Sequence, residues 1–111
     1  MMFNYFEEVE NPVTVCDANG IILYMNAASR QMLNKYGGQN LIGKSLYDCH
    51  NENSNRIIRE LLEHKKSNTY MVEKEGKRKL VHQTPWFENG RLAGLIEIIT
   101  FLPEDLKEVK R

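Results

Sequence analysis

The first clear pattern in the chain is a pair of strand-like segments. Apolar and polar side chains alternate over residues 13–17, and residues 21–25 are apolar throughout. Alternation at every second position, and short apolar runs between turn residues, are typical of β-strands. The Asp-Ala-Asn-Gly sequence at 17–20 favours a tight turn, because Asn and Gly tolerate positive φ. These residues therefore predict a β-hairpin.

Apolar residues then recur at helical spacing. Asn26 is a natural N-cap, and the helix expected after it should stop at the Gly-Gly pair at 37–38. Residues 41–47, interrupted by Gly43, predict an irregular or single-turn stretch. A second helix is expected beyond them, with an apolar stripe that should lie on a sheet and consists of Ile57, Ile58, Leu61 and Leu62.

Three further strands are predicted in the second half of the chain, at 69–74, 79–87 and 92–102. An Asn-Gly pair at 89–90 indicates a tight hairpin between the last two. The final strand is apolar on both faces except at Glu97. This pattern indicates a sheet that is covered on both sides or that forms an interface.

Short helical patterns flank this unit. Residues 1–10 carry apolar side chains at helical spacing and predict an amphipathic helix, either a lid on the core or a helix that forms a dimer. Pro103 is tolerated in a first helical turn, so residues 103–111 predict the start of an exit helix. The domain itself is expected to span 11–102.

Composition narrows the class of partner. The 111 residues fit one domain, and 15 basic residues balance 15 acidic ones, so no net charge attracts nucleic acid or an anionic membrane. No apolar run approaches the roughly 20 residues that span a bilayer, and the N-terminus lacks signal-peptide features. A cytoplasmic protein is expected, in which Cys16 and Cys49 are reduced rather than bridged.

Three stretches resemble the PAS domain. Its opening, an Asp-x-x-Gly hairpin whose second strand ends in Asn before a helix, is similar to NPVTVCDANGIILYMNAASRQML. Its middle segment and its last hairpin are similar to LIGKSLYDC and ENGRLAGLIEII. The resemblance covers about residues 11–102. The DCHN sequence before a long helix is most similar to PAS modules of bacterial transcriptional regulators and hemerythrin-like proteins.

The resemblance implies an α+β fold, with a five-stranded antiparallel sheet in the order 2-1-5-4-3, helices on one face and a pocket between them. Pockets of this family hold haem, flavin, small organic acids or nothing. The family often ends its last strand in Asp-Ile-Thr, which anchors an exit helix. Phe101-Leu102-Pro103 stands at that place here, so signal transmission is expected to use other contacts.

Two groups of residues are candidates for lining the pocket. Cys49 and His50 lie where a polar loop meets the second helix, so they are expected at a cavity rim, with a thiol that could respond to redox state. Four strand residues would supply polar groups if their faces point inward, or a dimer surface if they point outward. They are Tyr70, His82, Thr84 and Trp86.

Other chemistry is less supported. Adjacent Cys49 and His50 lack the spacing of a structural zinc site or the facing geometry of a thiol enzyme. Flavin-binding relatives carry an arginine that Asp48-Cys49-His50-Asn51 lacks. Haem stays as an alternative, with His50 or His82 as axial ligand.

The sequence thus predicts a non-enzymatic sensory module that binds a small ligand or responds to redox state. It is expected to form a homodimer and to pass a signal to an effector domain or partner protein. Two alternatives stay open: a haem-based gas or redox sensor, and a purely structural dimerisation module with a filled core.

Overall fold

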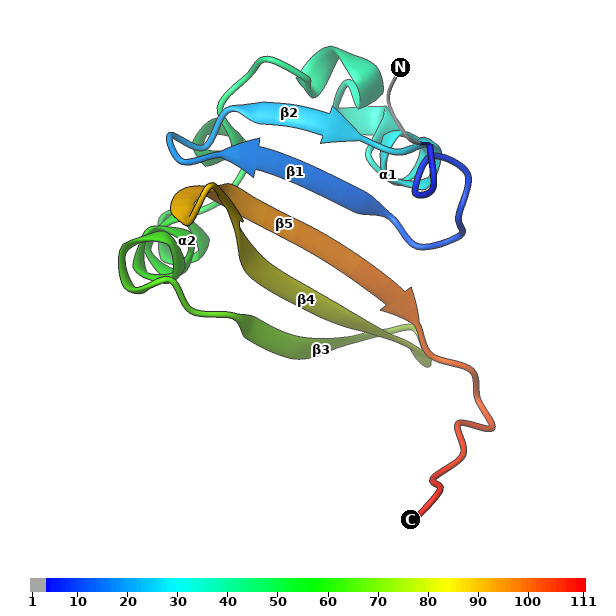
Figure 1. Cartoon of the computed structure of the whole chain (residues 1–111). Helices are drawn as coiled ribbons and strands as arrows, with labels where there is room; N and C mark the ends of the chain where they lie inside the picture. The colour runs from blue at the N-terminus through cyan, green and yellow to red at the C-terminus, as the bar shows by residue number, and fades with distance from the viewer. Residues whose placement is uncertain (1–3) are drawn as a thin grey trace.

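Five strands form one antiparallel sheet in the computed structural model, which describes residues 4–111. The order across the sheet is β2-β1-β5-β4-β3 (Figure 1), which confirms the predicted fold class. Each strand overlaps a segment predicted from the sequence. The strands are β1 (Val13–Asp17), β2 (Ile22–Met25), β3 (Asn68–Lys74), β4 (Lys77–Glu88) and β5 (Arg91–Phe101).

Among residues 4–111, the helical elements lie between β2 and β3 in the chain. The two α-helices are α1 (Ala27–Met32) and α2 (Glu52–His64), and short 3-10 turns connect them. These turns are η1 (Asn34–Tyr36), η2 (Gly38–Leu41) and η3 (Leu46–Asp48). The expected helix after Asn26 is therefore shorter than predicted, because its regular part ends at Met32.

The core lies between the sheet and these helices. The predicted stripe on α2 is its buried face, where Ile58, Leu61 and Leu62 each retain less than a tenth of their exposure. They pack with Cys16 of β1 and Leu95 of β5 in one apolar cluster. Burial of a leucine-sized side chain contributes about 2 kcal/mol, so this cluster is the main stabilising element of the domain.

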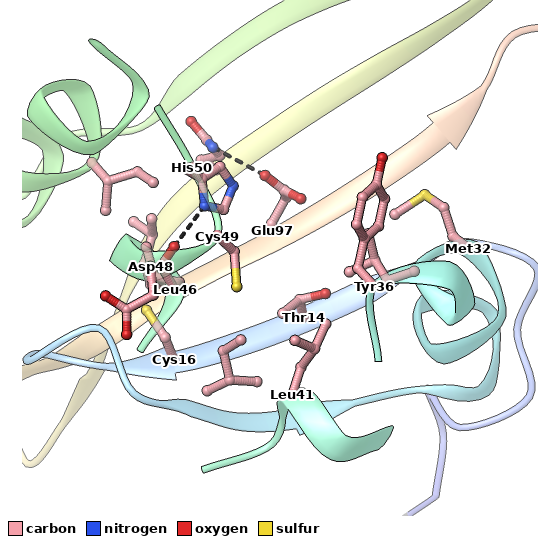
Figure 2. A pocket seen from close by; sticks show the side chains of 15 residues that line it. Thr14, Cys16, Met32, Tyr36, Leu41, Leu46, Asp48, Cys49, His50 and Glu97 are labelled. Carbon is pink, nitrogen blue, oxygen red and sulfur yellow. Dashed lines mark hydrogen bonds between the residues drawn. The ribbon is translucent and has the colours of Figure 1, made fainter. Parts of the chain in front are cut away.

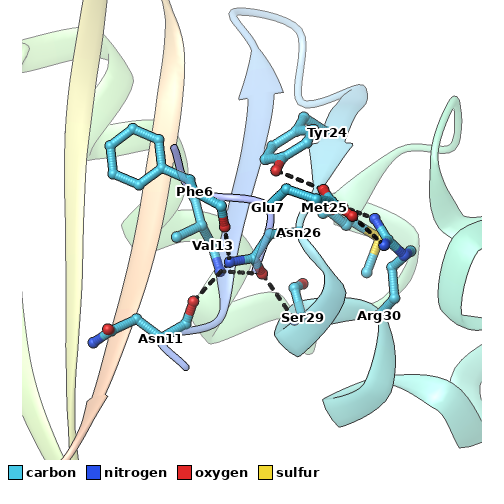
Figure 3. Close-up of polar contacts among 9 residues, drawn as sticks. All are labelled: Phe6, Glu7, Asn11, Val13, Tyr24, Met25, Asn26, Ser29 and Arg30. Atoms are coloured by element: carbon cyan, nitrogen blue, oxygen red, sulfur yellow. Dashed lines mark hydrogen bonds and ion pairs between the residues drawn. The ribbon is translucent and has the colours of Figure 1, made fainter. Parts of the chain in front are cut away.

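A buried asparagine joins the N-terminal segment to the sheet (Figure 3). The side chain of Asn26 caps α1 by accepting a hydrogen bond from Ser29 N, and it also accepts one from Val13 N, both at 2.9 Å. Its amide donates to Phe6 O at 2.7 Å and to Asn11 O at 2.8 Å. One side chain thus holds β1, α1 and the N-terminal segment together.

The prediction of a helix on each side of the domain was wrong, because residues 4–10 and 102–111 form no helix. Residues 5–8 form a turn, and the Phe6 and Glu7 carbonyls bond to Asn26 Nδ2 and Ala27 N instead of to a helical ladder. Residues 1–3 of that prediction lie outside the described residues. After β5 the chain runs away from the sheet without a helix (Figure 1). A nine-residue helix is marginal without packing, and Leu106 and Val109 are 56% and 70% exposed.

Candidate ligand cavity

A cavity of about 610 Å³ lies between the sheet and the helical segment (Figure 2). Its volume falls in the range of sites that hold a small molecule. The walls are mostly apolar, and polar side chains gather on the sheet floor and at the rim. The lining consists of Thr14, Cys16, Ile22, Met32, Leu33, Tyr36, Leu41, Leu46, Asp48, Cys49, His50, Ile58, Gln83, Leu95 and Glu97.

The floor carries a row of polar side chains that crosses adjacent strands. Thr14 of β1 is directly opposite Glu97 of β5, which is opposite Gln83 of β4. Gln83 Nε2 donates to Glu97 Oε2 at 3.0 Å. Directly opposite residues share a sheet face, so the row points into one space.

This row was not among the predicted site residues. The sequence signal was present at Glu97, the one charged side chain of the predicted strand at 92–102. Its partners could not be found from spacing, because Thr14, Gln83 and Glu97 meet only through the pairing of three strands.

Cys49 and His50 belong to the cavity lining, and both are exposed at its rim. They follow η3, whose N-cap Ser45 accepts a hydrogen bond from Tyr47 N. His50 Nδ1 lies 2.8 Å from Leu46 O, and Cys49 Sγ lies 3.9 Å from Ser45 O. Each side chain therefore contacts a backbone carbonyl of its own turn, and neither contacts the other as a catalytic dyad would.

Cys16 places a second thiol in the cavity wall. It is 2% exposed, and both cysteines are free. Burial, followed by the negative charges of Asp17 and Glu97, raises the pKa of the Cys16 thiol. Cys16 therefore stays protonated at neutral pH, whereas Cys49 is exposed to solvent.

The four predicted strand residues do not line the cavity. His82, Thr84 and Trp86 alternate with Gln83 and lie on the outer face of the sheet. His82 Nδ1 lies 2.7 Å from Thr69 Oγ1 there, and Trp86 Nε1 donates to Cys16 O at 3.0 Å. The strand register explains this placement. Gln83 is the β4 residue opposite Glu97 and shares its inner face, so the residues on either side of Gln83, His82 and Thr84, face outward.

Tyr70 shares the inner face, since it is opposite Val81, but it lies beyond the lining near the sheet edge. Burial, and secondarily the negative charge of Glu97, raises the pKa of its phenol. The negative charge of Glu97 therefore contributes to the raised pKa of both Tyr70 and Cys16.

The residues at the cavity fit haem poorly. His50 could serve as an axial ligand, because its Nδ1 is occupied by the Leu46 carbonyl and this orients the ring. The acidic lining residues are Asp48 and Glu97, and the lining includes no Lys or Arg for the carboxylates of a porphyrin. His82, on the outer face, could not reach the cavity.

Residues 4–111 contain no group of three or more His, Cys, Asp or Glu side chains placed to hold a metal ion. Within the same range, no helix is both long and apolar enough to cross a bilayer.

The sheet order, together with a cavity between the sheet and the helices, is that of a PAS-type fold. A family model described as PAS fold matches residues 6–102. The chain belongs to the PAS family, as its sequence predicted. The predicted subgroup of Cys-His modules is untested. No curated protein matches the chain in sequence.

Solved PAS structures share the fold at low identity. The PAS domain of the histidine kinase ThkA is 17% identical, with a TM-score of 0.67 over 80% of this chain and 97% of that chain. The Aer2 receptor from Vibrio cholerae, described as a dual PAS-heme oxygen sensor, is 16% identical, with a TM-score of 0.62 over 84% and 95%.

VqmA bound to DPO is 17% identical, with a TM-score of 0.71 over 89% of this chain and 55% of that chain. These identities show a shared fold. One of these proteins, Aer2, is described as an oxygen sensor.

Proposed function

We propose that this chain is a non-enzymatic sensory module that binds a small organic molecule in the cavity between the sheet and the helical segment. The observation that carries the proposal is the cavity itself: an apolar space with a few polar groups, Thr14, Gln83 and Glu97, on one wall. Such an arrangement is typical of small-molecule sites, in which apolar walls supply affinity and polar groups orient the ligand. One structural neighbour, VqmA, is described as bound to a ligand, DPO.

The proposed signal leaves the domain through the segments next to β1 and β5. Glu97 stands on the cavity floor four residues before the end of β5. Two residues beyond it, Ile99 N donates to Pro12 O and Ile99 O accepts from Asn11 Nδ2. A ligand that shifts β5 would therefore move residues 11–12 and the segment after Phe101 together.

A homodimer is the second part of the proposal. The outer sheet face carries Leu80, Trp86, Ile96 and Ile98, and Met71 of the neighbouring strand is 52% exposed. Aromatic and methionine side chains are enriched at protein interfaces. In the proposal, ligand and partner occupy opposite faces of one sheet.

The redox part of the proposal rests on Cys49. Its thiol is exposed at the rim, whereas the Cys16 thiol is buried and its pKa is raised. Oxidants would therefore modify Cys49 first, at the place where a ligand enters.

The cavity is tested with a neutral probe and a blocking substitution. Phenethyl alcohol is titrated into isotopically labelled protein while two-dimensional NMR spectra of the backbone amides are recorded. We expect shift changes to gather at residues of the lining. Leu33→Trp should abolish them, because Leu33 lines the cavity and indole fills it.

The control is Ile42→Trp, the same kind of enlargement at an exposed position outside the lining. It should leave the titration unchanged. Shift changes scattered over the surface, or equal responses of the two variants, would overturn ligand binding in the cavity.

A further inference from the structure

The charged side chains that line the cavity are of one sign. Asp48 and Glu97 contribute carboxylates, the lining includes no Lys or Arg, and His50 is its one imidazole. In Figure 2 the Glu97 carboxylate is seen between His50 at the rim and Tyr36. A ligand in this space meets negative charge on the floor and again at the rim.

Glu97 is the more informative of the two acids, because it stands within the sheet. It lies in the middle of β5, half-buried, and its described hydrogen-bond partner is the neutral amide of Gln83. The ion pairs among residues 4–111 join other residues, at Glu7, Glu52, Glu60 and Glu63.

A carboxylate can accept about four hydrogen bonds through its two oxygens, and the Gln83 amide supplies one of them. The charge of Glu97 also reaches across the inner face, since it contributes to the raised pKa values of Cys16 and Tyr70. The Glu97 carboxylate on the floor therefore has unused acceptor positions and no cationic partner among residues 4–111. A bound ligand could supply that cation.

We infer that the cavity selects an organic monocation: a small ammonium compound whose N–H groups donate to Glu97 and whose apolar body packs on the surrounding wall. The inference rests on the proposed function, because it names the chemical class of the ligand for the same cavity. The wall that receives the apolar body includes Leu41, Leu46 and Leu95, all buried.

The same arrangement rejects anions. A carboxylate or phosphate ligand would place like charge beside Glu97 without a cation in the lining to offset it. Asp48 at the rim is exposed and adds attraction for a cation during approach. Charge, rather than shape alone, is thus the main filter of the cavity.

Three probes with the same apolar group and different charges distinguish the effect of ligand charge from that of ligand shape. Phenethylammonium, phenethyl alcohol and hydrocinnamate all carry a phenethyl group, with a positive, neutral and negative head. Dissociation constants are measured from NMR shifts of the lining residues at low ionic strength. We expect the cation to bind about tenfold or more tightly than the alcohol, as a charge-assisted hydrogen bond supplies, and the anion to bind most weakly.

Glu97→Gln tests the residue. The variant retains an oxygen that can accept from Gln83 but removes the charge, so the cation should lose its advantage over the alcohol. Alcohol-induced shift changes that still gather at the lining residues show that the cavity of the variant is intact. Glu63→Gln is the matched control, since it removes the same charge from an exposed position on α2 and should preserve the ranking.

The possible results are distinguishable. If the alcohol binds as tightly as the cation in the wild-type protein, or if the cation is indifferent to Glu97→Gln, charge selection is wrong while ligand binding stands. If none of the three probes shifts the lining residues, the proposed function fails and charge selection fails with it. The wild-type ranking decides the matter even where Glu97→Gln does not fold.

Discussion

Asn26 is the residue on which most local structure converges. It is fully buried, and its side chain makes four hydrogen bonds to groups in three separate segments. A buried amide with every hydrogen-bonding group used is strongly stabilising in context, because loss of the side chain leaves its partners unpaired away from water. The sequence identified Asn26 as an N-cap, but it gave no sign of the bonds to Val13, Phe6 and Asn11.

Asn26→Ala should lower the free energy of unfolding by about 3 kcal/mol, the sum of a lost cap and of unpaired buried groups. Asn26→Asp should not rescue it, because a carboxylate oxygen would then face the carbonyls of Phe6 and Asn11. Urea unfolding followed by circular dichroism measures both.

Asn51→Ala is the matched control, since Asn51 caps α2 from an exposed position through one bond to Ser54 N. Its cost should be about 1 kcal/mol, that of a cap alone. Equal losses at the two positions would contradict the linking role of Asn26.

At the scale of elements, the close approach of β1 to β5 is the most demanding feature. A Cβ on Gly94 would lie 1.9 Å from Cys16 O. Trp86 also reaches this carbonyl from β4, and a bulge follows it at Trp86/Phe87. The sheet therefore has room for hydrogen at position 94 and for no side chain.

Gly94→Ala should lower the free energy of unfolding by about 3 kcal/mol or more, because relief of the clash requires β1 and β5 to separate. Gly90→Ala provides the comparison. It introduces the same methyl group where nothing lies within 4 Å, at a φ of +79° in the β4–β5 turn. Its cost should be about 1 kcal/mol, that of a left-handed alanine. Both are measured by urea unfolding, and a Gly94→Ala cost no larger than that of Gly90→Ala would disprove the packing argument.

At the scale of the whole molecule, the two sheet faces have different roles in the proposal: the inner face binds the ligand and the outer face binds a second copy. Light scattering after size exclusion should give a mass near twice the 13.0 kDa of one chain. Met71→Glu should shift it to the single-chain value, because the charge would be buried in the interface.

Ile42→Glu serves as the control. Ile42 is an exposed apolar residue that follows η2 at its C-terminal cap, so it does not belong to the outer face of the sheet. It should leave the mass unchanged. A single-chain mass for the wild-type protein throughout a dilution series would exclude the homodimer.

Local patterns in the sequence were enough to identify the strands, the two helices between them and their order. Strand alternation, the turn at 17–20, the cap at Asn26 and the stripe on α2 are local patterns, so each could be identified from a few neighbouring residues. The predictions of the two flanking helices failed because such helices depend on contacts outside the local sequence. Their apolar spacing was real, but a short helix needs a surface to pack on, and no local pattern says whether one exists.

Which sheet face encloses the cavity became clear from the pairing of the strands in three dimensions. Alternation assigns residues to two faces without saying which is inside, so His82, Thr84 and Trp86 were equally compatible with a pocket or an outer surface. The register of β1, β5 and β4 settled it by bringing together Thr14, Glu97 and Gln83, which lie far apart in the sequence. A binding site built from side chains on several strands exists only after those strands pair.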